Sequence, residues 1–294
     1  MLFMVSASLA IIRRYKIVGK GTVWVIGASS GLGLATAQAF AADGWQVISG
    51  ARSFDAANDH PMDGAIRQLH LDVTDAESRR AFAKAALDAS PRVDAFVYCA
   101  AVLVLGPCEQ TATAEYERVM QTNFLGLTAM VSLVLPAMRN QRSGKIILFS
   151  SINGLLGIPF QSAYTASKHA VEGYAECLAM EVKPFGVQVC LVEPGDHRGG
   201  SQHTRLHTQA GAEPSPYEPA CSTATAIIHQ DESGGLLPAR LGQKVLKNAS
   251  RKHMRIRLRV AKADQKLAVW LHDLLPPSLN FRILRDYYGK GGHA

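Results

Sequence analysis

The chain has 294 residues, of which 48% are hydrophobic, and carries a formal net charge of +7. This length and hydrophobic content suffice for one large α/β domain or two small ones, and they exclude a disordered or fibrous protein. The cysteines are Cys99, Cys108, Cys177, Cys190 and Cys221. Their odd number, with no CxxC or His-paired spacing, argues against a disulfide framework and a metal site. We therefore expect a cytoplasmic protein without a bound metal.

The first twelve residues are almost entirely apolar and are followed by Arg13, Arg14 and Lys16. A bilayer-spanning helix needs about 20 residues, and a secretory signal carries its positive charges before the apolar run. Three interpretations stay open: a packed or frayed extension, a peripheral membrane contact through residues 1–12, and an export signal. We treat residues 1–20 as an extension and residues 21–294 as one domain.

Short apolar runs alternate with helical stretches from Thr22 onward. Strands are predicted at 23–26, 47–49, 69–71, 95–98, 146–149 and 187–192, and helices at 32–42, 76–87, 114–138 and 163–182. Each parallel step between neighbouring strands requires a crossover connection. The alternation therefore predicts a Rossmann-type α/β fold, a doubly wound parallel sheet with helices on both faces.

The stretch from Gly195 to Leu237 is dense in Gly, Ser, Thr, Pro and His, and it predicts a substrate loop over about 196–237. In the C-terminal segment 238–294, residues 239–250 predict a helix. Residues 254–260 alternate apolar side chains with Arg255, Arg257 and Arg259, which predicts a strand with one solvated face. The alternative is that these arginines bind an anionic surface. Interleaved aromatic residues are absent there, so we expect no nucleic-acid binding.

A glycine-rich turn follows the first predicted strand and opens the first helix. It reads Gly27-Ala28-Ser29-Ser30-Gly31-Leu32-Gly33. Glycines let a phosphate approach the main chain, and a helix N-terminus offers unpaired N–H groups and a positive dipole end. The placement predicts a dinucleotide pyrophosphate site, although a glycine turn can also serve only close helix–strand packing.

The second predicted strand ends at Arg52, where the adenosine ribose of a nucleotide at the first turn would lie. An acidic side chain there selects NAD(H), whereas a guanidinium suits a 2'-phosphate. Arg52 therefore favours NADP(H) over NAD(H), with an ordinary surface arginine as the alternative.

Tyr164 and Lys168 are four residues apart on a predicted helix and share one face. An ammonium near a phenol favours phenolate, so we expect the pKa of Tyr164 to fall from about 10 toward neutral, as a general acid/base requires. Ser151, just beyond a predicted strand, could place its hydroxyl beside the same substrate oxygen.

The glycine turn, Asn123, Ser151, Tyr164 and Lys168, in this order and spacing, resemble the short-chain dehydrogenase/reductase family. The resemblance implies that Tyr164 transfers the proton, Ser151 polarises the substrate oxygen, and Lys168 binds the nicotinamide ribose and lowers the tyrosine pKa. It also implies that Asn123 holds a water in a proton relay. Further implied cofactor contacts are Asp72 and Val73 at the adenine, Ala100, and the Pro194-Gly195 turn beneath the nicotinamide.

Two positions depart from the family pattern. The family has Asn-Ala-Gly after the fourth strand, and this chain has Cys99-Ala100-Ala101; the family's threonine beyond the Pro-Gly turn is Gly199 here. A methyl group in place of glycine could crowd the ribose. These changes bear on cofactor affinity.

The run from Gly154 to Phe160 resembles the hydroxysteroid and retinol dehydrogenase branch of the family. The resemblance implies an NADP(H)-dependent oxidoreductase acting on an apolar ketone, aldehyde or alcohol, steroid-, retinoid- or lipid-like, and a homodimer or homotetramer. Leu155, Leu156, Ile158 and Phe160 are expected to line the pocket or to pack in the core. Residues 196–198 are expected to bind a polar substrate group or to be solvated. The alternatives are a non-catalytic NADP-sensing protein on the same scaffold and a nicotinamide-free lyase or dehalogenase.

Overall fold

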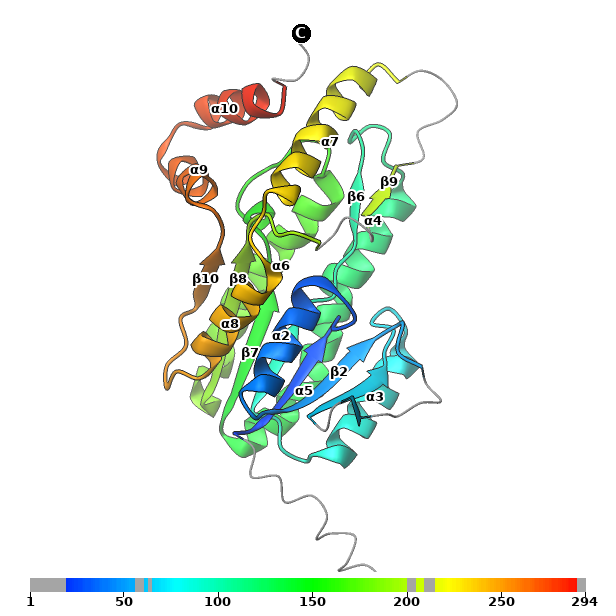
Figure 1. The fold of residues 1–294 in the computed structure, drawn as a ribbon, viewed down its shortest axis with the longest axis vertical. Helices are drawn as coiled ribbons and strands as arrows, with labels where there is room; N and C mark the ends of the chain where they lie inside the picture. Colours follow the sequence, from blue (N-terminus) through cyan, green and yellow to red (C-terminus); the bar gives the residue numbers. More distant parts are fainter. Residues whose placement is uncertain (1–19, 56–60, 63–64, 200–204, 209–214, 290–294) are drawn as a thin grey trace, which may run out of the picture.

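The computed structural model describes residues 20–55, 61–62, 65–199, 205–208 and 215–289 (Figure 1). Two expectations fall wholly or partly outside these residues. The apolar segment 1–12, with its membrane interpretation, lies outside, as do residues 200–204 and 209–214 of the expected substrate loop.

An eight-stranded sheet forms the centre of the described domain. Its strands, in spatial order, are β10 (Arg257–Val260), β8 (Val187–Pro194), β7 (Gly144–Phe149), β5 (Ala95–Tyr98), β1 (Thr22–Ile26), β2 (Gln46–Ala51), β4 (Ile66–His70) and β3 (Pro61–Met62). All neighbours pair in parallel except β3 with β4. The order reverses direction between β1 and β5, which creates the crevice where doubly wound folds bind ligands. The predicted fold class is confirmed.

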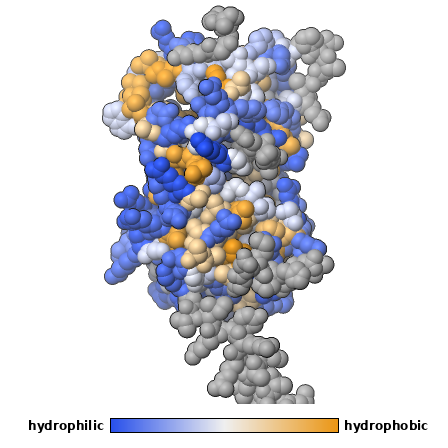
Figure 2. Space-filling model, in the orientation of Figure 1, coloured by the Kyte–Doolittle hydropathy of each residue, from blue (hydrophilic) through white to orange (hydrophobic). Residues whose placement is uncertain are grey.

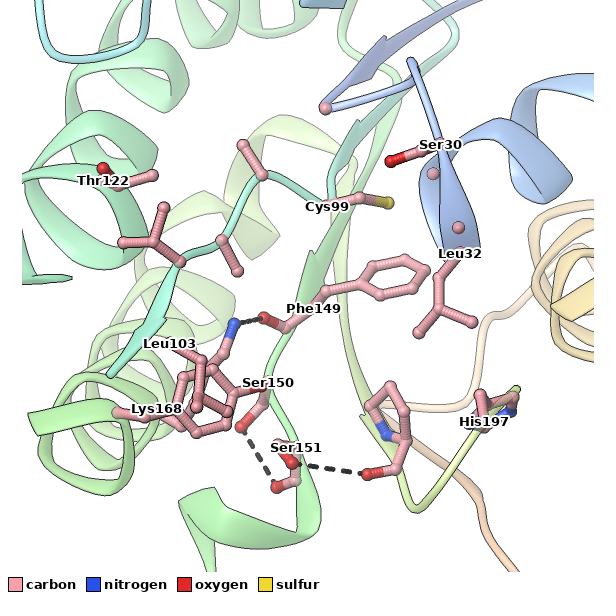
Figure 3. A pocket seen from close by; sticks show the side chains of 18 of the residues that line it. Ser30, Leu32, Cys99, Leu103, Thr122, Phe149, Ser150, Ser151, Lys168 and His197 are labelled. Carbon is pink, nitrogen blue, oxygen red and sulfur yellow. Dashed lines mark hydrogen bonds between the residues drawn. The ribbon is translucent and has the colours of Figure 1, made fainter. Parts of the chain in front are cut away.

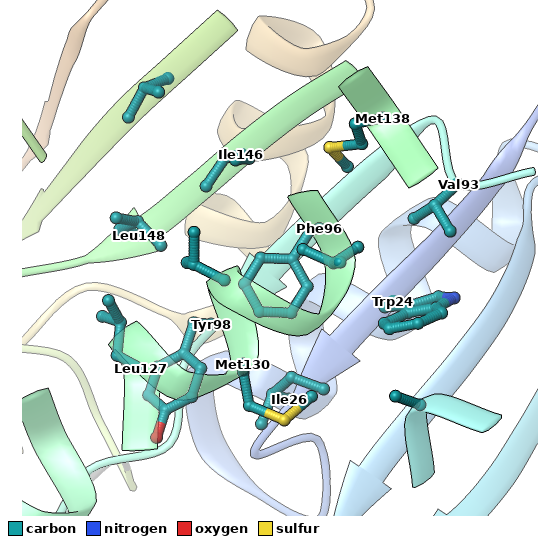
Figure 4. Close-up of a cluster of buried hydrophobic side chains, with 14 of the residues drawn as sticks. Trp24, Ile26, Val93, Phe96, Tyr98, Leu127, Met130, Met138, Ile146 and Leu148 are labelled. Atoms are coloured by element: carbon teal, nitrogen blue, oxygen red, sulfur yellow. The ribbon is translucent and has the colours of Figure 1, made fainter. Parts of the chain in front are cut away.

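Helices cover both faces of the sheet (Figure 1). On one face lie α2 (Gly31–Ala42) and α8 (Pro238–Ala249), which pack Phe40, Leu241 and Val245 against the sheet. On the other lie α3 (Ala76–Ala89), α5 (Gly126–Gln141) and α6 (Ser162–Val182). The core on that second face includes Trp24, whose ring meets Phe82 edge to face at 5.6 Å (Figure 4). Strands covered on both sides need continuous apolar runs, as these have.

The predicted helix 114–138 is interrupted. It consists of α4 (Thr113–Met120), a π-helical turn η1 (Gln121–Leu125) and α5. Within the described part of the chain, the continuous segment Thr113–Gln141 is the helical stretch whose length and composition would allow it to cross a membrane. Its residues Leu127, Met130 and Val134 are fully buried in the core beneath the sheet.

The stretch from 196 to 237 was predicted as a loop, and this is wrong for nearly half of it. Residues Glu218–Ser233 form helix α7, and β9 (Arg205–His207) pairs with β6 (Leu103–Leu105) in a separate two-stranded ribbon. The high Ser and Thr content of α7 hid a helical signal, since Ala224 and Ile228, four residues apart, are its buried contacts.

The predicted strand 254–260 is shorter than expected, and its arginines are not simply solvated. Arg257 and Arg259 bind Glu193 of the neighbouring strand at 2.6 and 2.7 Å, and Arg257 also binds Glu172 at 2.6 Å. Glu193 is completely buried, so it requires these charged partners. The alternating pattern of residues 254–260 could not predict this, because Glu193 lies on another strand.

The chain continues into α9 (Ala263–Leu274) and α10 (Pro277–Gly289), which lie beyond the carboxyl ends of the strands (Figure 1). Apolar residues gather on the surface over these two helices (Figure 2).

Candidate active site

A cavity of about 450 Å³ opens at the carboxyl ends of β1 and β5, in the crevice where the strand order reverses. Most residues predicted for the site line it: Gly27, Ser29, Ser30, Gly31, Leu32, Gly33, Arg52, Val73, Ala100, Ser151, Tyr164, Lys168, Pro194 and Gly195. Asp72 and Asn123 do not line it. Segments from both halves of the chain therefore meet in one cavity (Figure 3).

The glycine turn has the geometry of a phosphate cradle. Gly27 has φ +81°, and a Cβ placed on it would lie 2.6 Å from the backbone nitrogen of Ala100. A Cβ on Gly33 would collide with the carbonyl oxygen of Gly27. Ser30 precedes α2 without a side-chain cap hydrogen bond, so the helix N-terminus presents its N–H groups to the cavity. These features fit a dinucleotide.

Arg52 lies just past the end of β2, on the adenosine side of this turn, with its side chain exposed at the cavity. Asp72 lies nearby but turns its carboxylate to Thr74, whose backbone N–H and hydroxyl donate to it at 2.8 and 2.7 Å. Burial disfavours the charge on Asp72, yet the Thr74 hydrogen bonds and the Arg52 guanidinium hold its pKa below the usual value. Arg52 is thus an exposed cation at the cavity, close enough to Asp72 to lower the pKa of that carboxyl.

The acid/base group is assembled from β7 and α6. Ser151 follows β7, and Tyr164 and Lys168 lie one turn apart on α6. The Ser151 hydroxyl donates to the Asn153 amide oxygen at 3.2 Å and the Pro194 carbonyl oxygen at 3.5 Å, and it lies near enough to the Tyr164 phenol to favour the phenolate. The ammonium of Lys168 lies 5.5 Å from the centre of the Tyr164 ring. Lys168 Nζ donates to the carbonyl oxygen of Phe149 at 2.7 Å (Figure 3).

The structure corrects the expected ionisation of this pair. Burial raises the pKa of Tyr164 to about 12, only partly opposed by the nearby Ser151 hydroxyl. Burial also lowers the pKa of Lys168 to about 8. The lysine ammonium is held by a backbone carbonyl and not at the phenol oxygen, so Tyr164 is a neutral phenol at neutral pH, the form that donates a proton.

Asn123 serves as a connector in the π-turn. Its amide accepts from the Val102 N–H at 2.8 Å and donates to the Val102 carbonyl and the Ser167 hydroxyl, both at 2.9 Å. Ser167 in turn donates to the carbonyl oxygen of Tyr164 at 2.7 Å. Asn123 therefore fixes the loop after β5 to the helix that carries the tyrosine, and its neighbour Thr122 lines the cavity.

One of the two departures from the family pattern, Cys99-Ala100-Ala101, lies at the crevice. Cys99 keeps the connection between β5 and β1, its N–H donating to the Ile26 carbonyl at 2.8 Å, and Cys99 and Ala101 both line the cavity. Burial raises the pKa of the Cys99 thiol well above its usual range, so it is present as a thiol. Gly199 has φ +67° and does not line the cavity.

The cavity extends past Tyr164 into a part that the sequence revealed only for Ile158, Asp196 and His197. Ile158 lines it, but Leu155 and Leu156 pack in a small cluster with Ala261 and Val269. Further lining residues are Asp196 and His197, Asp231 and Glu232 of α7, and Tyr288 of α10. Asp231 and Glu232 were missed because the helical nature of 218–233 was missed, and Tyr288 because α10 reaches the cavity only in the folded chain.

This end of the cavity is acidic. Burial and the charges of Asp231 and Glu232 raise the pKa of Asp196 to about 6, while Glu232 forms a buried ion pair with Arg205 of β9. Within the described residues, no group of three or more His, Cys, Asp or Glu side chains could hold a metal ion. His197 binds the Gly195 carbonyl oxygen through Nδ1 at 2.8 Å, and its buried Nε2 has no partner among the described residues.

A glycine cradle at a topological switch point, with a buried Ser–Tyr–Lys group beside it, defines a nucleotide-dependent oxidoreductase. The family model described as short chain dehydrogenase matches residues 21–209. The chain therefore belongs to the short-chain dehydrogenase/reductase family, whose members use NAD(P) to interconvert carbonyl and alcohol groups.

Similarity to individual proteins supports the same family assignment. The chain is 36% identical over 266 residues to a 3-ketodihydrosphingosine reductase of Bacteroides thetaiotaomicron, covering 90% of this chain and 97% of that one. It is 36% identical over 183 residues to human retinol dehydrogenase 8, covering 59% of this chain and 58% of that one. A crystal structure of a short-chain dehydrogenase from Streptomyces avermitilis superposes with a TM-score of 0.76 at 28% identity, covering 93% of this chain and all of that one. These matches support the retinol and hydroxysteroid dehydrogenase-like branch.

Proposed function

We propose that the protein is an NADPH-dependent reductase of a lipid-like ketone, with Ser151, Tyr164 and Lys168 as its catalytic residues. The observation that carries the proposal is that Ser151, Tyr164 and Lys168 line the same cavity as the glycine turn, with the Lys168 ammonium 5.5 Å from the centre of the Tyr164 ring. A bound nicotinamide would supply the hydride. The chain's own residues supply orientation and the proton.

Tyr164 delivers that proton in the reductive direction. The pKa of Tyr164, at about 12, keeps the phenol neutral, so it donates to the substrate oxygen as negative charge develops there. The Ser151 hydroxyl donates a second hydrogen bond to the same oxygen. Lys168, held by the Phe149 carbonyl, provides a cation behind the ring at a fixed distance, and Asn123 keeps α6 in register with the cavity wall.

NADPH is preferred over NADH in this proposal because Arg52 stands where the adenosine ribose of a nucleotide in the glycine cradle would lie. Among the residues that the structure describes, no acidic side chain at the end of β2 lines the cavity. A 2'-phosphate would gain a charge-assisted hydrogen bond from Arg52, whereas a ribose hydroxyl would find no carboxylate acceptor there.

The substrate part of the cavity favours a molecule with an apolar body and a positive group near the ketone. Ile158 and Ile228 provide apolar walls, and Asp196, Asp231 and Glu232 line the same space. The relative from Bacteroides thetaiotaomicron is named for a substrate of this kind, 3-ketodihydrosphingosine, a long-chain amino ketone. We propose that class of substrate for this chain.

Initial rates test the proposal. Wild-type protein is expected to oxidise NADPH faster than NADH with 3-ketodihydrosphingosine, retinal and a steroid ketone as the panel. Tyr164→Phe should reduce the rate by about 10²- to 10⁴-fold, the contribution of a general acid. Tyr174→Phe, a phenol on the same helix that packs against Phe124 outside the cavity, is the control. Equal rates for wild type and Tyr164→Phe would refute the assignment.

We also propose a compartment and an oligomeric state for the enzyme. All five cysteines are free, which suits a reducing, cytoplasmic compartment, and the single domain runs from residue 21 onward. Leu125 of η1 and Met180 of α6 are exposed by 44% and 69%, which supports a homo-oligomer formed through this side of the molecule. Light scattering of wild type against Met180→Arg would show the assembly and its loss.

A further inference from the structure

The arginines of β10 belong to a charge cluster on the far side of α6 from solvent. Arg257 binds Glu172 and Glu176 of α6 at 2.6 and 2.5 Å and Glu193 of β8 at 2.6 Å. Arg259 binds Glu193 at 2.7 Å. Three carboxylates therefore share two guanidiniums, which leaves one negative charge in excess.

Glu172 is a member of this cluster that lies inside the protein. Its side chain is 8% exposed, whereas that of Glu176 is 57% exposed. Its Oε2 accepts from Arg257, but its Oε1 is buried and has no hydrogen-bond partner among the described residues. A buried carboxylate that serves only the fold normally has both oxygens paired. Arg257 therefore compensates the charge of Glu172 only in part.

The side chain of Glu172 lies beside the active-site lysine. Glu172 follows Lys168 by one turn of α6, and helical side chains lean back toward the preceding turn. A Cβ placed on Gly154 would collide with the Ser150 hydroxyl and would lie 3.1 Å from both the Cγ of Glu172 and the carbonyl oxygen of Lys168. The Lys168 ammonium binds the carbonyl oxygen of Phe149, the residue before Ser150. Carboxylate and ammonium therefore flank the same end of β7.

Lys168 needs a negative charge in its surroundings. It is 2% exposed, and its ammonium is held by a neutral carbonyl group, while burial lowers its pKa to about 8. The groups that oppose this effect are Cys99 and Glu172. Cys99 is a neutral thiol, because burial raises its pKa well above the usual range. Glu172 is therefore the neighbour that supplies a negative charge.

We propose that Glu172 is a positioning residue whose carboxylate, held by Arg257, keeps Lys168 in the ammonium form behind the Tyr164 ring. Burial and Glu193 raise the pKa of Glu172, and the Arg257 guanidinium opposes them. The carboxyl has to be ionised near pH 8, where Lys168 titrates. The catalytic use of this ammonium rests on the proposed function, whereas the effect of Glu172 on the charge of Lys168 does not.

NMR of the nucleotide-free protein with isotope-labelled lysine gives a direct test. We expect one lysine Cε signal to titrate near pH 8, and its absence from Lys168→Arg assigns it. In Glu172→Gln this signal should titrate at a pH lower by at least about 0.5, because an opposite charge near the ammonium is lost. Glu176→Gln removes an exposed carboxylate from the same Arg257, so it is the matched control and should titrate as wild type.

Two further variants separate charge from structure. Glu172→Met is a second neutral variant, for the case that a buried amide prevents folding, and should show the same downward shift. Glu172→Asp keeps the charge and should return the titration toward that of wild type. The proposal is overturned if Lys168 titrates at the wild-type pH in the neutral variants. It is also overturned if Glu176→Gln shifts the titration as much as Glu172→Gln, since the effect would then belong to the cluster as a whole.

Initial rates of ketone reduction distinguish this result from the proposed function. In Glu172→Gln the fall of kcat/KM at high pH should move to the same lower pH as the NMR titration, measured relative to the plateau of that variant. If the titration moves and the rate profile does not, Glu172 still controls the charge of Lys168. The reduction would then not depend on the ammonium, and the role of Lys168 in the proposed function would fail.

Discussion

Burial changes the pKa values of both central residues of the site, Tyr164 and Lys168. Burial removes water from both side chains and favours the neutral form of each. It therefore raises the pKa of Tyr164 to about 12 and lowers the pKa of Lys168 to about 8. Lys168 is therefore the group whose charge changes close to the working pH. The cation behind the phenol is present below about pH 8 and is lost above it.

The pH profile of reduction should report this loss. We expect kcat/KM for ketone reduction to be level below pH 8 and to fall above it, because Tyr164 stays protonated while the Lys168 ammonium disappears. Lys168→Arg keeps its charge at all these pH values, so its rate, although lower, should stay level. Initial rates between about pH 6 and about pH 10 provide the measurement. A fall at the same pH in Lys168→Arg would assign the titration to another group.

The acidic end of the cavity should select for positive charge in the substrate. Asp231→Asn removes one charge beside Asp196, and we expect KM for 3-ketodihydrosphingosine to rise about tenfold, the effect of about 1.4 kcal/mol. The N-acetylated ketone, which has no cation, is the matched control and should show little change. Below about pH 6 the wild type should also bind the amine more weakly, since Asp196 becomes protonated there. Equal effects on both ketones would exclude charge recognition.

At the scale of elements, the junction of β1 and α2 determines whether a nucleotide can bind. Gly27 and Gly44 have nearly the same φ, +81° and +83°. A Cβ on Gly27 would meet the backbone of Ala100, whereas a Cβ on Gly44 would meet nothing within 4 Å. The chain thus contains its own control for separating conformational strain from steric conflict.

Alanine substitutions at Gly27 and Gly44 separate the two effects. Gly44→Ala should lower the free energy of unfolding by about 1–2 kcal/mol, the strain of a left-handed alanine, with nucleotide affinity unchanged. Gly27→Ala should lower it further and weaken nucleotide binding at least tenfold, because β1 and the loop after β5 must separate. Urea denaturation and nucleotide titration measure both quantities. If Gly27→Ala costs no more than Gly44→Ala, the turn is not closely packed.

The elements that could be predicted are those whose signal is local. The strands 95–98 and 146–149 could be predicted because a short run of apolar residues, many of them β-branched, indicates a strand by itself. The glycine turn could be predicted because it lies in the sequence between a predicted strand and a predicted helix. Helix α7 was missed because its buried residues include only two apolar side chains, Ala224 and Ile228, beside Glu232. The break at Asn123 was missed because a π-turn depends on the Val102 and Ser167 contacts, which join distant segments.

At the scale of the whole molecule, the site is a property of the assembled sheet. The residues that we propose to bind the cofactor come from loops after β1, β2, β4, β5 and β8, and the proposed acid/base group comes from β7 and α6. The sequence named these residues correctly as neighbours because parallel strands end at one edge. It could not reveal the acidic end of the cavity, because Asp231 and Tyr288 approach Asp196 only after the C-terminal helices fold over the strands.

A ligand that joins so many segments should stabilise the entire domain. A nucleotide present at 100 times its Kd adds about 2.7 kcal/mol to the free energy of unfolding, and each tenfold difference in affinity changes this by about 1.4 kcal/mol. At equal concentrations, NADPH should therefore raise the unfolding midpoint more than NADH, because only NADPH offers a ribose 2'-phosphate to Arg52. Arg52→Ala should remove the difference while leaving the stabilisation by NADH intact, and Arg118→Ala, an exposed arginine of α4 outside the cavity, should change neither. Thermal unfolding of the three proteins with each nucleotide measures the preference without any substrate. A difference that survives in Arg52→Ala would place the selection for the phosphate elsewhere in the crevice.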